Sequence, residues 1–319
     1  MKKRGRAALL FGAVLLVSAC TSGGASPSAA QTSEAPATQP PATQAPPSEA
    51  AAPTPPPPAT PIPGGLLDVV TKAGQIRVST DPQYPPQSAL KPDGTFEGFD
   101  IDVATEIATR MGLGVKWETP SWDTITAGSW GGRWDMSVGS MTITAPRQKV
   151  VDFSPPYYYT PAQMAASTAS GITTLDGLAG KTVCVGEATT YLDWLGGTLI
   201  FGTEYPSPQA KPPFKITPIT QSTDRLCAEA WKAGRTDWQG WLSSSTTVDQ
   251  AIKDGLPLIK LGNPVFCEPL AAAVDKSGPD PTDFMAKVDE IVTTMHADGT
   301  LTQLSQKWFG ADLTQKLGS

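Results

Sequence analysis

The sequence predicts an α/β fold made of two similar modules joined in one chain. In each module a short helix ends at a glycine and a strand follows, at 66–80 and again at 175–185. Each module later carries the pattern Gly-Arg-x-Asp between a helix and a strand, at 132–135 and at 234–237. Because helices that alternate with strands cover the faces of mostly parallel sheets, this repeat predicts two α/β lobes with a cleft between them.

The N-terminal part of the chain has the composition of a targeting segment followed by a linker. A basic start precedes a short apolar run, and the stretch Leu16-Val17-Ser18-Ala19-Cys20 resembles a bacterial lipobox. It predicts a lipoprotein signal peptide over 1–20 with lipidation of Cys20, and an ordinary secretion signal is the alternative. Residues 21–63 are nearly all Ser, Ala, Thr, Pro, Gln and Gly, so we expect a disordered tether that cannot bury a core.

Charge and cysteine usage limit the classes of partner. The chain of 319 residues has a net charge of −6, and loss of its basic start would make it more acidic, which argues against nucleic acid as a partner. After Cys20 the cysteines are Cys184, Cys227 and Cys267, and an oxidising compartment favours one disulfide with one thiol left over. Neither their spacing nor the lone His296, which we expect on a helix surface, fits a metal site. We therefore expect no metal and no cofactor.

The segment 135–160 is the most informative part of the chain. A buried strand leads into small hydroxyl residues, which are followed by Arg147 and an aromatic cluster that ends at Tyr159. A guanidinium can hold both oxygens of a carboxylate, and strand ends of α/β sheets are common ligand sites. The segment therefore predicts a site for a small carboxylate, with a surface arginine after a β-hairpin as the alternative.

Several motifs, in this order, resemble the family 3 extracellular solute-binding proteins, the amino-acid receptors of ABC importers. They are DPQYPP at 81–86, GTFEGFDID at 94–102, MTITAPR at 141–147, FSPPYY at 153–158, and DGT at 298–300 ahead of KWF at 307–309. The similarity covers essentially 74–309. It implies a periplasmic-binding-protein-like (type II) fold with a two-strand hinge and an interlobe cleft. Lobe one would be 64–158 and 269–319, and lobe two would be 159–268.

The resemblance also implies a set of ligand contacts. Tyr84 would stack on the ligand body, Asp81 would lie near the distal end of the ligand side chain, and Arg147 would clamp the carboxylate. The turn at 187–190 opens a helix whose free N–H groups favour an anion. The remaining implied contacts are a wall from Trp122, backbone groups of Gly139 and Ser140, the hydroxyl of Thr142, and the turn residues Glu187, Thr189 and Thr190.

One implied contact is missing from the sequence. The family usually places an acid a few residues after the second Gly-Arg-x-Asp, where it pairs with the ligand α-ammonium, and here that position falls at or near Leu242. A desolvated ammonium without a counter-charge is costly. Glu187 is the first candidate to replace the acid, or else the ligand is not a standard amino acid. Trp238 and Trp241 could form a cation–π box for a bulky cation, or could simply pack inside the lobe.

Three further expectations concern structure. Asp100 and Asp102 precede a helix, where acids favour the positive end and cap it. Trp194 and Trp231 are expected in the core. The resemblance implies a Cys184–Cys227 disulfide, with Cys267 free near the hinge.

The resemblance and the lipobox together imply a receptor and not an enzyme. It would lie on the outer face of the cytoplasmic membrane, reach the membrane through its lipid anchor only, and act as a monomer. It would bind a small amino acid or a related carboxylate or zwitterion, and deliver it to the permease of an ABC transporter. One alternative is a cyclohexadienyl dehydratase-like enzyme on the same fold, with Glu187 as the acid. Another is a binding lobe that serves a separate membrane sensor or channel.

Overall fold

The computed structural model describes residues 61–206, 208–212 and 214–316. Its main feature is one long mixed β-sheet. The strand order is β10-β9-β11-β8-β13-β6-β1-β5, with β12 paired to β8 and β7 paired to β13. The predicted signal peptide, and the predicted tether up to residue 60, lie outside the described residues.

The sheet has two halves, and each half is built on a parallel core. The strands of the first half are β1 (Gln75–Ser79), β5 (Gly114–Glu118), β6 (Met136–Thr142) and β7 (Val151–Phe153). Those of the second half are β9 (Thr182–Gly186), β10 (Thr217–Gln221), β11 (Gly240–Ser244) and β12 (Leu258–Lys260). Strand β1 is parallel to β5 and β6, and β9 is parallel to β10 and β11, as the repeated helix-to-strand pattern predicted.

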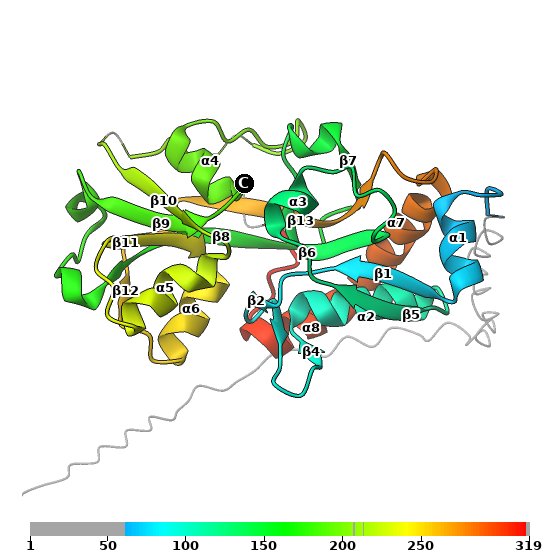
Figure 1. Cartoon of the computed structure of the whole chain (residues 1–319), viewed down its shortest axis with the longest axis horizontal. Helices are drawn as coiled ribbons and strands as arrows, with labels where there is room; N and C mark the ends of the chain where they lie inside the picture. Colours follow the sequence, from blue (N-terminus) through cyan, green and yellow to red (C-terminus); the bar gives the residue numbers. More distant parts are fainter. Residues whose placement is uncertain (1–60, 207, 213, 317–319) are drawn as a thin grey trace, which may run out of the picture. The chain divides into compact units, whose positions relative to one another are not determined.

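Two long antiparallel strands connect the halves. Strands β8 (Tyr158–Ser167) and β13 (Phe266–Asp275) pair with each other, while β8 also pairs with β11 and β13 also pairs with β6. Figure 1 shows the two strands extending from one half into the other. The structure therefore has two α/β lobes joined by a two-strand hinge, which confirms the predicted fold class. A small separate sheet holds β2 (Gln83–Tyr84), β3 (Ser88–Leu90) and β4 (Phe96–Glu97).

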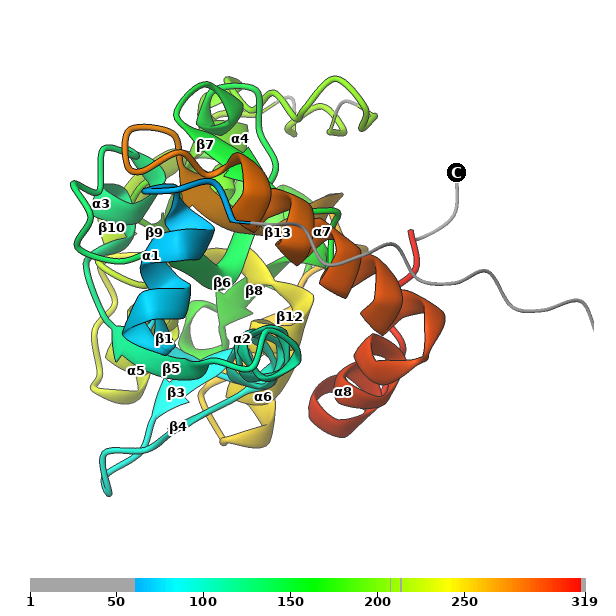
Figure 2. The ribbon, with the colours of Figure 1, turned by 90° about the vertical axis from the view of Figure 1, so that its right-hand side faces the viewer.

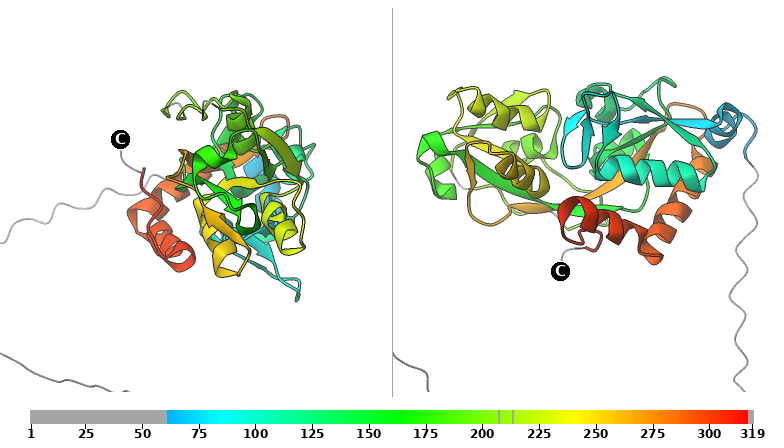
Figure 3. Two further views of the ribbon diagram at one scale, coloured as in Figure 1. Left: turned by 90° about the vertical axis from the view of Figure 1, so that its left-hand side faces the viewer. Right: turned by 90° about the horizontal axis from the view of Figure 1, so that it is seen from below.

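Helices cover both halves of the sheet. In the first lobe they are α1 (Leu66–Ala73), α2 (Phe99–Arg110), α3 (Trp122–Thr126), α7 (Thr282–Ala297) and α8 (Thr300–Phe309). In the second they are α4 (Thr190–Gly196), α5 (Asp224–Lys232) and α6 (Ser245–Lys253). Short 3-10 turns occur at η1 (Arg147–Lys149), η2 (Thr168–Ser170) and η3 (Leu175–Leu178). Figure 3 shows from below the yellow helices on one half and the cyan and orange helices on the other.

The C-terminal helices return to the first lobe. Helix α7 buries Phe284, Val288, Ile291 and Met295, a spacing of three and four residues that puts one apolar stripe on the sheet side. These side chains share a hydrophobic core with α1, α2, β1 and β6. Figure 2 shows α7 beside α1, and α8 packs against α2 and α7. Because the C-terminal helices pack on the first lobe, the chain leaves that lobe along β8 and returns to it along β13.

The second lobe has a core on each face of its sheet. Trp194 packs on one face, and Trp231, Trp238 and Trp241 pack with Cys184 on the other. The expectation that Trp194 and Trp231 are core residues is thus confirmed. Cys184 of β9 and Cys227 of α5 form the expected disulfide, with a Cα–Cα distance of 5.7 Å. Cys267 is free and partly exposed on the hinge strand β13.

The expectation that acids cap the helix after residue 98 needs correction. Asp100 and Asp102 lie in the first turn of α2, but Gly98 is the N-cap and no side chain caps the helix. Asp100 is instead fully buried against other side chains, and Asp102 accepts hydrogen bonds from Lys307 and Trp308 of α8. His296, expected on a helix surface, lies on α7 and is partly exposed, with its Nε2 2.8 Å from the carbonyl oxygen of Pro156.

The described helices are too short or too polar to cross a membrane. Over the same residues, no three His, Cys, Asp or Glu side chains are grouped so that they could hold a metal ion.

The disulfide should contribute strongly to stability. It closes a loop with a sequence separation of 43 between two fully buried residues. We expect Cys184→Ala/Cys227→Ala to lower the free energy of unfolding by about 4 kcal/mol, because the cross-link restricts the unfolded chain. That loss corresponds to roughly 10 °C in Tm by calorimetry. The matched control is Cys267→Ala, which removes a free thiol and should change Tm little; equal losses in both variants would contradict the assignment.

Candidate functional site

A cavity lies between the two lobes at the hinge. The space between its walls is about 520 Å³, including space open to solvent. Lobe one contributes the loop after β1, the start of α3, the end of β6 and η1. Lobe two contributes the loops that precede α4 and α5. The lining residues are Asp81, Tyr84, Trp122, Gly139, Ser140, Thr142, Arg147, Gly186, Glu187, Thr189, Thr190, Tyr191, Ser222, Thr223, Asp224, Glu268 and Leu270.

The structure brings all but one of the predicted ligand contacts to this cavity. The exception is Trp241, which is not among the described residues that line it. Its side chain is fully buried in the second-lobe core beside the disulfide. Because neighbouring residues of a strand face opposite sides, Trp241 belongs to the core that contains α5. The hypothesis of a tryptophan box at the ligand is therefore wrong for Trp241, and Trp238 lies in the same core.

Arg147 is the cation among the described residues that line the cavity, and it is held from both lobes. Its guanidinium donates to the carbonyl of Thr142 at 3.2 Å in lobe one and to that of Ala188 at 2.9 Å in lobe two. The guanidinium carbon lies 5.4 Å from the centroid of the Trp122 ring. Burial lowers the pKa of Arg147 to about 10, against the opposing negative charge of Glu268. Arg147 therefore remains positively charged at neutral pH.

The turn before α4 is partly satisfied within the protein. Thr189 is the N-cap of α4, and its hydroxyl oxygen accepts the N–H of Leu192. The hydroxyl of Thr190 donates to the carboxylate of Glu268. Glu187, the predicted replacement for the missing acid, is exposed at the cavity lining. The turn thus contacts a carboxyl group of the protein itself, which weakens its expected role as an anion site.

Glu268 is one of two buried carboxyl groups, among the described residues of the cavity, that the sequence did not predict there. It lies on the hinge strand β13 and is 1% exposed. Its Oε1 accepts hydrogen bonds from Thr142 of lobe one, at 2.8 Å, and from Thr190 of lobe two. Burial raises its pKa, while these hydroxyls and Arg147 act in the opposite direction. Glu268 therefore connects the hinge with both walls of the cavity.

Asp224 is the second such carboxyl group, at the first position of α5. Its Oδ1 accepts the N–H of Gly186 at 2.5 Å, and its Oδ2 accepts the hydroxyl of Ser243 at 3.2 Å. Burial raises its pKa to about 8. Leu242 points into the opposite core, but its neighbour Ser243 contacts Asp224. Asp224 of α5 thus places a carboxyl group beside the part of β11, near Leu242, where the expected acid is missing.

Ser140 is used differently from the expectation. Its backbone N–H donates to the hydroxyl of Tyr157 at 2.9 Å, so this group is already bonded within the protein. Its own hydroxyl donates to Asp100 at 2.7 Å, and Tyr157 donates to the other oxygen of Asp100 at 2.8 Å. Ser140 has a φ of 56°, a backbone conformation that costs free energy for residues other than glycine. Asp100, whose pKa burial raises to about 7, therefore helps hold the cavity wall in this conformation.

Asp81 and Tyr84 lie at the lobe-one side of the cavity. Asp81 accepts the N–H of Gln83 at 2.7 Å, and burial raises its pKa to about 6. The hydroxyl of Tyr84 donates to Ser244 of lobe two at 3.0 Å. Gln87 also donates to Ser244 at 3.0 Å and to Thr246 at 2.7 Å. These bonds hold the two lobes together around the cavity.

Similar proteins share both sequence and fold. The L-cystine-binding protein TcyJ of Escherichia coli is 29% identical over 79% of this chain and 88% of its own. A probable amino-acid ABC transporter-binding protein of Haemophilus influenzae is 24% identical over 79% and 91%.

Solved structures agree with these relatives. An ABC transporter substrate-binding protein from Streptococcus pneumoniae with bound histidine has a TM-score of 0.65 at 24% identity, over 80% of this chain and all of the other. The ancestral amino acid-binding protein AncCDT-1, a precursor of cyclohexadienyl dehydratase, has a TM-score of 0.64 at 27% identity, over 76% and 99%.

The family model agrees with the fold, the cavity and these similarities. The model of the bacterial extracellular solute-binding proteins, family 3, matches residues 76–311, which span both lobes and the hinge. This chain belongs to family 3 of the bacterial extracellular solute-binding proteins.

Proposed function

We propose that this protein is an extracytoplasmic receptor for a small amino acid or a related zwitterion. One observation carries the proposal: a buried guanidinium and buried carboxyl groups line the same interlobe cavity. Arg147 offers donors to a carboxylate, while Asp224 and Glu268 offer acceptors to an ammonium group. The opposite charges of an amino acid therefore each have a partner.

The hinge supplies the movement that such a receptor needs. Lobe one (64–158 and 269–319) and lobe two (159–268) would close around β8 and β13. Tyr84 and Arg147 each donate one hydrogen bond to lobe two, and Gln87 bonds to the hydroxyls of Ser244, Thr246 and Thr247. Such bonds are each worth only about 1 kcal/mol net, so a ligand that adds contacts to both lobes can shift the balance towards closure. Closure would then be the state that the importer recognises.

The relatives support an amino acid as ligand. One is named for L-cystine, and one solved structure holds histidine. We propose that the ligand passes to the permease of an ABC transporter, and that the receptor acts as a monomer. Lipidation of Cys20 would anchor it to the outer face of the cytoplasmic membrane, with the segment up to residue 63 as the tether.

A dehydratase-like activity is the second candidate. Asp224, with its pKa raised to about 8, is a carboxyl group that can hold a proton at neutral pH inside the cavity, as a general acid must. One structural neighbour is also a binding-protein precursor of cyclohexadienyl dehydratase. Absorbance assays with prephenate and arogenate test this activity. Turnover that Asp224→Asn abolishes would establish it, and no turnover would remove it.

A thermal-shift screen should identify amino acids as ligands. The mature chain would be melted with amino acids, L-cystine, betaines and organic acids. A ligand that fills the cavity at 100 times its Kd should add about 2.7 kcal/mol of stability, because it binds the folded state alone. We expect the shifts to occur with compounds that carry both an α-carboxylate and an α-ammonium. Shifts confined to betaines or organic acids would contradict an amino-acid receptor.

Loss of the guanidinium should abolish this binding. We expect Arg147→Ala to weaken binding of the best amino acid by at least about 30-fold by calorimetry, because a buried carboxylate would lose its counter-charge. Arg133→Ala is the matched control. Arg133 also stacks on a tryptophan, Trp134, but it is exposed and lies outside the cavity lining. Unchanged affinity in Arg147→Ala with a normal melting transition would show that Arg147 does not hold the carboxylate.

A further inference from the structure

The two lobes also meet outside the cavity, at a buried side chain of lobe one. Gln87 lies between β2 and β3 and is fully buried. Its amide reaches three buried hydroxyl groups of lobe two, at the end of β11 and in the first turn of α6. They belong to Ser244, Thr246 and Thr247. These four side chains, called the Gln87 latch below, are not among the described residues that line the cavity.

The amide of Gln87 finds all its partners within the latch. Its Nε2 donates to Ser244 at 3.0 Å and to Thr246 at 2.7 Å. The hydroxyl of Ser244 donates to Thr247 at 2.9 Å, and the hydroxyl of Thr247 donates to Oε1 of Gln87 at 3.2 Å. Gln87, Ser244 and Thr247 thus form a closed ring in which each side chain both donates and accepts. Hydrogen bonds in such a network polarise and strengthen one another.

The lobe-one half of the latch is held in place by its backbone. The N–H of Gln87 donates to the carbonyl of Tyr84 at 3.0 Å, and its carbonyl accepts the N–H of Asp100, in the first turn of α2, at 2.9 Å. Gly98, just before α2, has a φ of 137°, and a Cβ atom there would overlap the carbonyl oxygen of Gln87. Because this backbone is fixed, little conformational freedom is lost when the amide binds lobe two.

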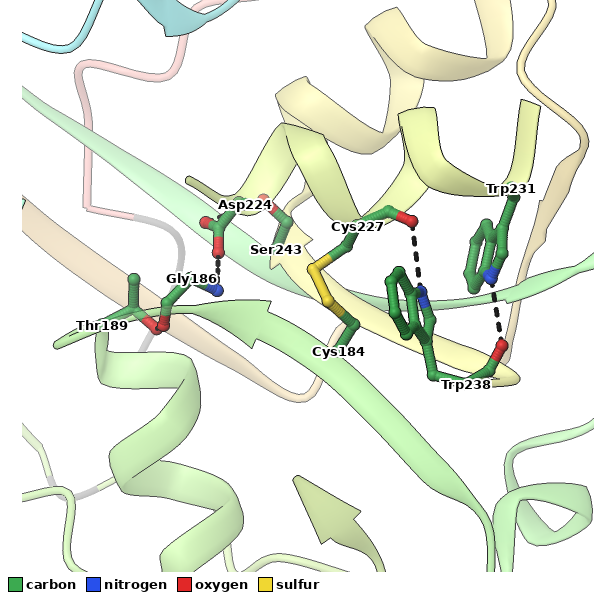
Figure 4. Close-up of a disulfide and its surroundings, with 8 residues drawn as sticks. All are labelled: Cys184, Gly186, Thr189, Asp224, Cys227, Trp231, Trp238 and Ser243. Carbon is green, nitrogen blue, oxygen red and sulfur yellow. Dashed lines mark hydrogen bonds between the residues drawn. A yellow bond between two sulfur atoms is a disulfide. The ribbon is translucent and has the colours of Figure 1, made fainter. Parts of the chain in front are cut away.

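The lobe-two half of the latch is attached to a cross-linked wall. Ser244 is the N-cap of α6, and its hydroxyl oxygen accepts the N–H of Thr247. Its neighbour Ser243 donates to Asp224 of α5, and Figure 4 shows this pair beside the disulfide that ties α5 to β9. The hydroxyls of the latch are therefore positioned by lobe two itself, before lobe one approaches.

All the bonds of the latch join groups of the protein itself. Tyr84 adds a further bond, since its hydroxyl donates to Ser244 at 3.0 Å. When the lobes are apart, the same groups bond to water, so each bond contributes only a modest net free energy. Several such bonds in one preorganised network still favour closure. They do so independently of the contacts that a ligand makes in the cavity.

We infer that Gln87 holds the lobes together whether or not a ligand is bound, so that it sets how much of the free protein is closed. As a statement about the lobes, the inference stands on the latch alone. As a control on ligand binding, it rests on the proposed receptor function. A small ligand that contacts both lobes enters while they are apart, so Gln87 would set the fraction of receptors that can admit it.

Distances between two spin labels test the latch in the mature full chain, which is first freed of bound small molecules by unfolding, dialysis and refolding. Thr109→Cys on α2 and Lys253→Cys on α6 put one label on an exposed position of each lobe, in a Cys267→Ala background. By double electron–electron resonance we expect a population at the distance of the closed structure. Gln87→Met keeps the length of the side chain but removes the amide. It should lower the closed-to-open ratio at least about fivefold, the factor for one net hydrogen bond.

A second variant breaks the same contact from lobe two. Thr246→Val keeps the shape of the side chain and removes its hydroxyl, so it should also lower the closed-to-open ratio. The double variant with Gln87→Met should open the lobes less than the sum of the two single effects, because both remove one shared bond. Gln163→Ala is the matched control, because the buried amide of Gln163 bonds to the carbonyls of Met164 and Leu261 within lobe two. It should lower Tm and leave the interlobe distances unchanged.

Two results would overturn the inference. One is a free protein that shows only distances longer than that of the closed structure. The other is a closed population that stays unchanged in both Gln87→Met and Thr246→Val, in proteins that melt normally. A failure of every amino acid to bind would instead remove the receptor function, and the distances would still decide whether the latch closes the lobes.

Discussion

The burial of one guanidinium between the lobes determines how the rest of the site is arranged. A charged group removed from water is costly unless it is hydrogen-bonded and paired. Arg147 meets this requirement with a carbonyl from each lobe, the face of Trp122 and the nearby charge of Glu268. Because Ala188 belongs to lobe two, the full set of contacts exists only while the lobes are together. The contacts that keep the Arg147 guanidinium buried in the cavity therefore also hold the two lobes together.

The hinge carries part of the site itself. Glu268 lies on β13, one of the two strands that connect the lobes, and bonds to Thr142 on one side and Thr190 on the other. A rotation about the hinge would change these bonds directly. In the proposed receptor, a ligand ammonium at Glu268 would act at the pivot, where small changes in contact produce large relative movements of the lobes. The disulfide, in contrast, lies wholly inside lobe two, between β9 and α5, and stiffens one wall without crossing the hinge.

Sequence reasoning recovered the features that local patterns specify. Helix-to-strand alternation predicted the parallel core of each lobe, and the hydroxyl run before Arg147 predicted the wall from which the guanidinium projects. It missed Asp224 and Glu268, since each depends on contacts between residues far apart in the chain. Asp224 at the start of a helix resembles an ordinary first-turn acid, and nothing local shows that Gly186 will approach it. The carboxyl-rich half of the cavity arises only when α5, β9 and the hinge are brought together.

The same distance in sequence explains why Trp241 lies in the core and why Ser140 bonds to other side chains. Trp241 and Leu242 alternate across β11, and only the position of α5 decides which face becomes the core that holds the disulfide. Ser140 lies in β6 and lines the cavity, yet Tyr157 and Asp100 accept its backbone N–H and its hydroxyl. In both cases the residue type was compatible with either role. Contacts with residues far apart in the sequence determine which role each residue has.

The buried carboxyl groups also affect stability. The pKa of Asp224 in the folded state is about 8, well above the value expected for an exposed aspartate. The folded state therefore holds a proton that the unfolded state loses at lower pH, and stability falls as pH rises from about 4 towards 8, by up to about 1.4 kcal/mol per pH unit for one group. Above about pH 8 the buried carboxyl ionises in the folded state as well, and the loss of stability is then complete. Below that pH the bound proton already neutralises the group, so any cation that pairs with Asp224 must first displace this proton, at a cost in binding free energy.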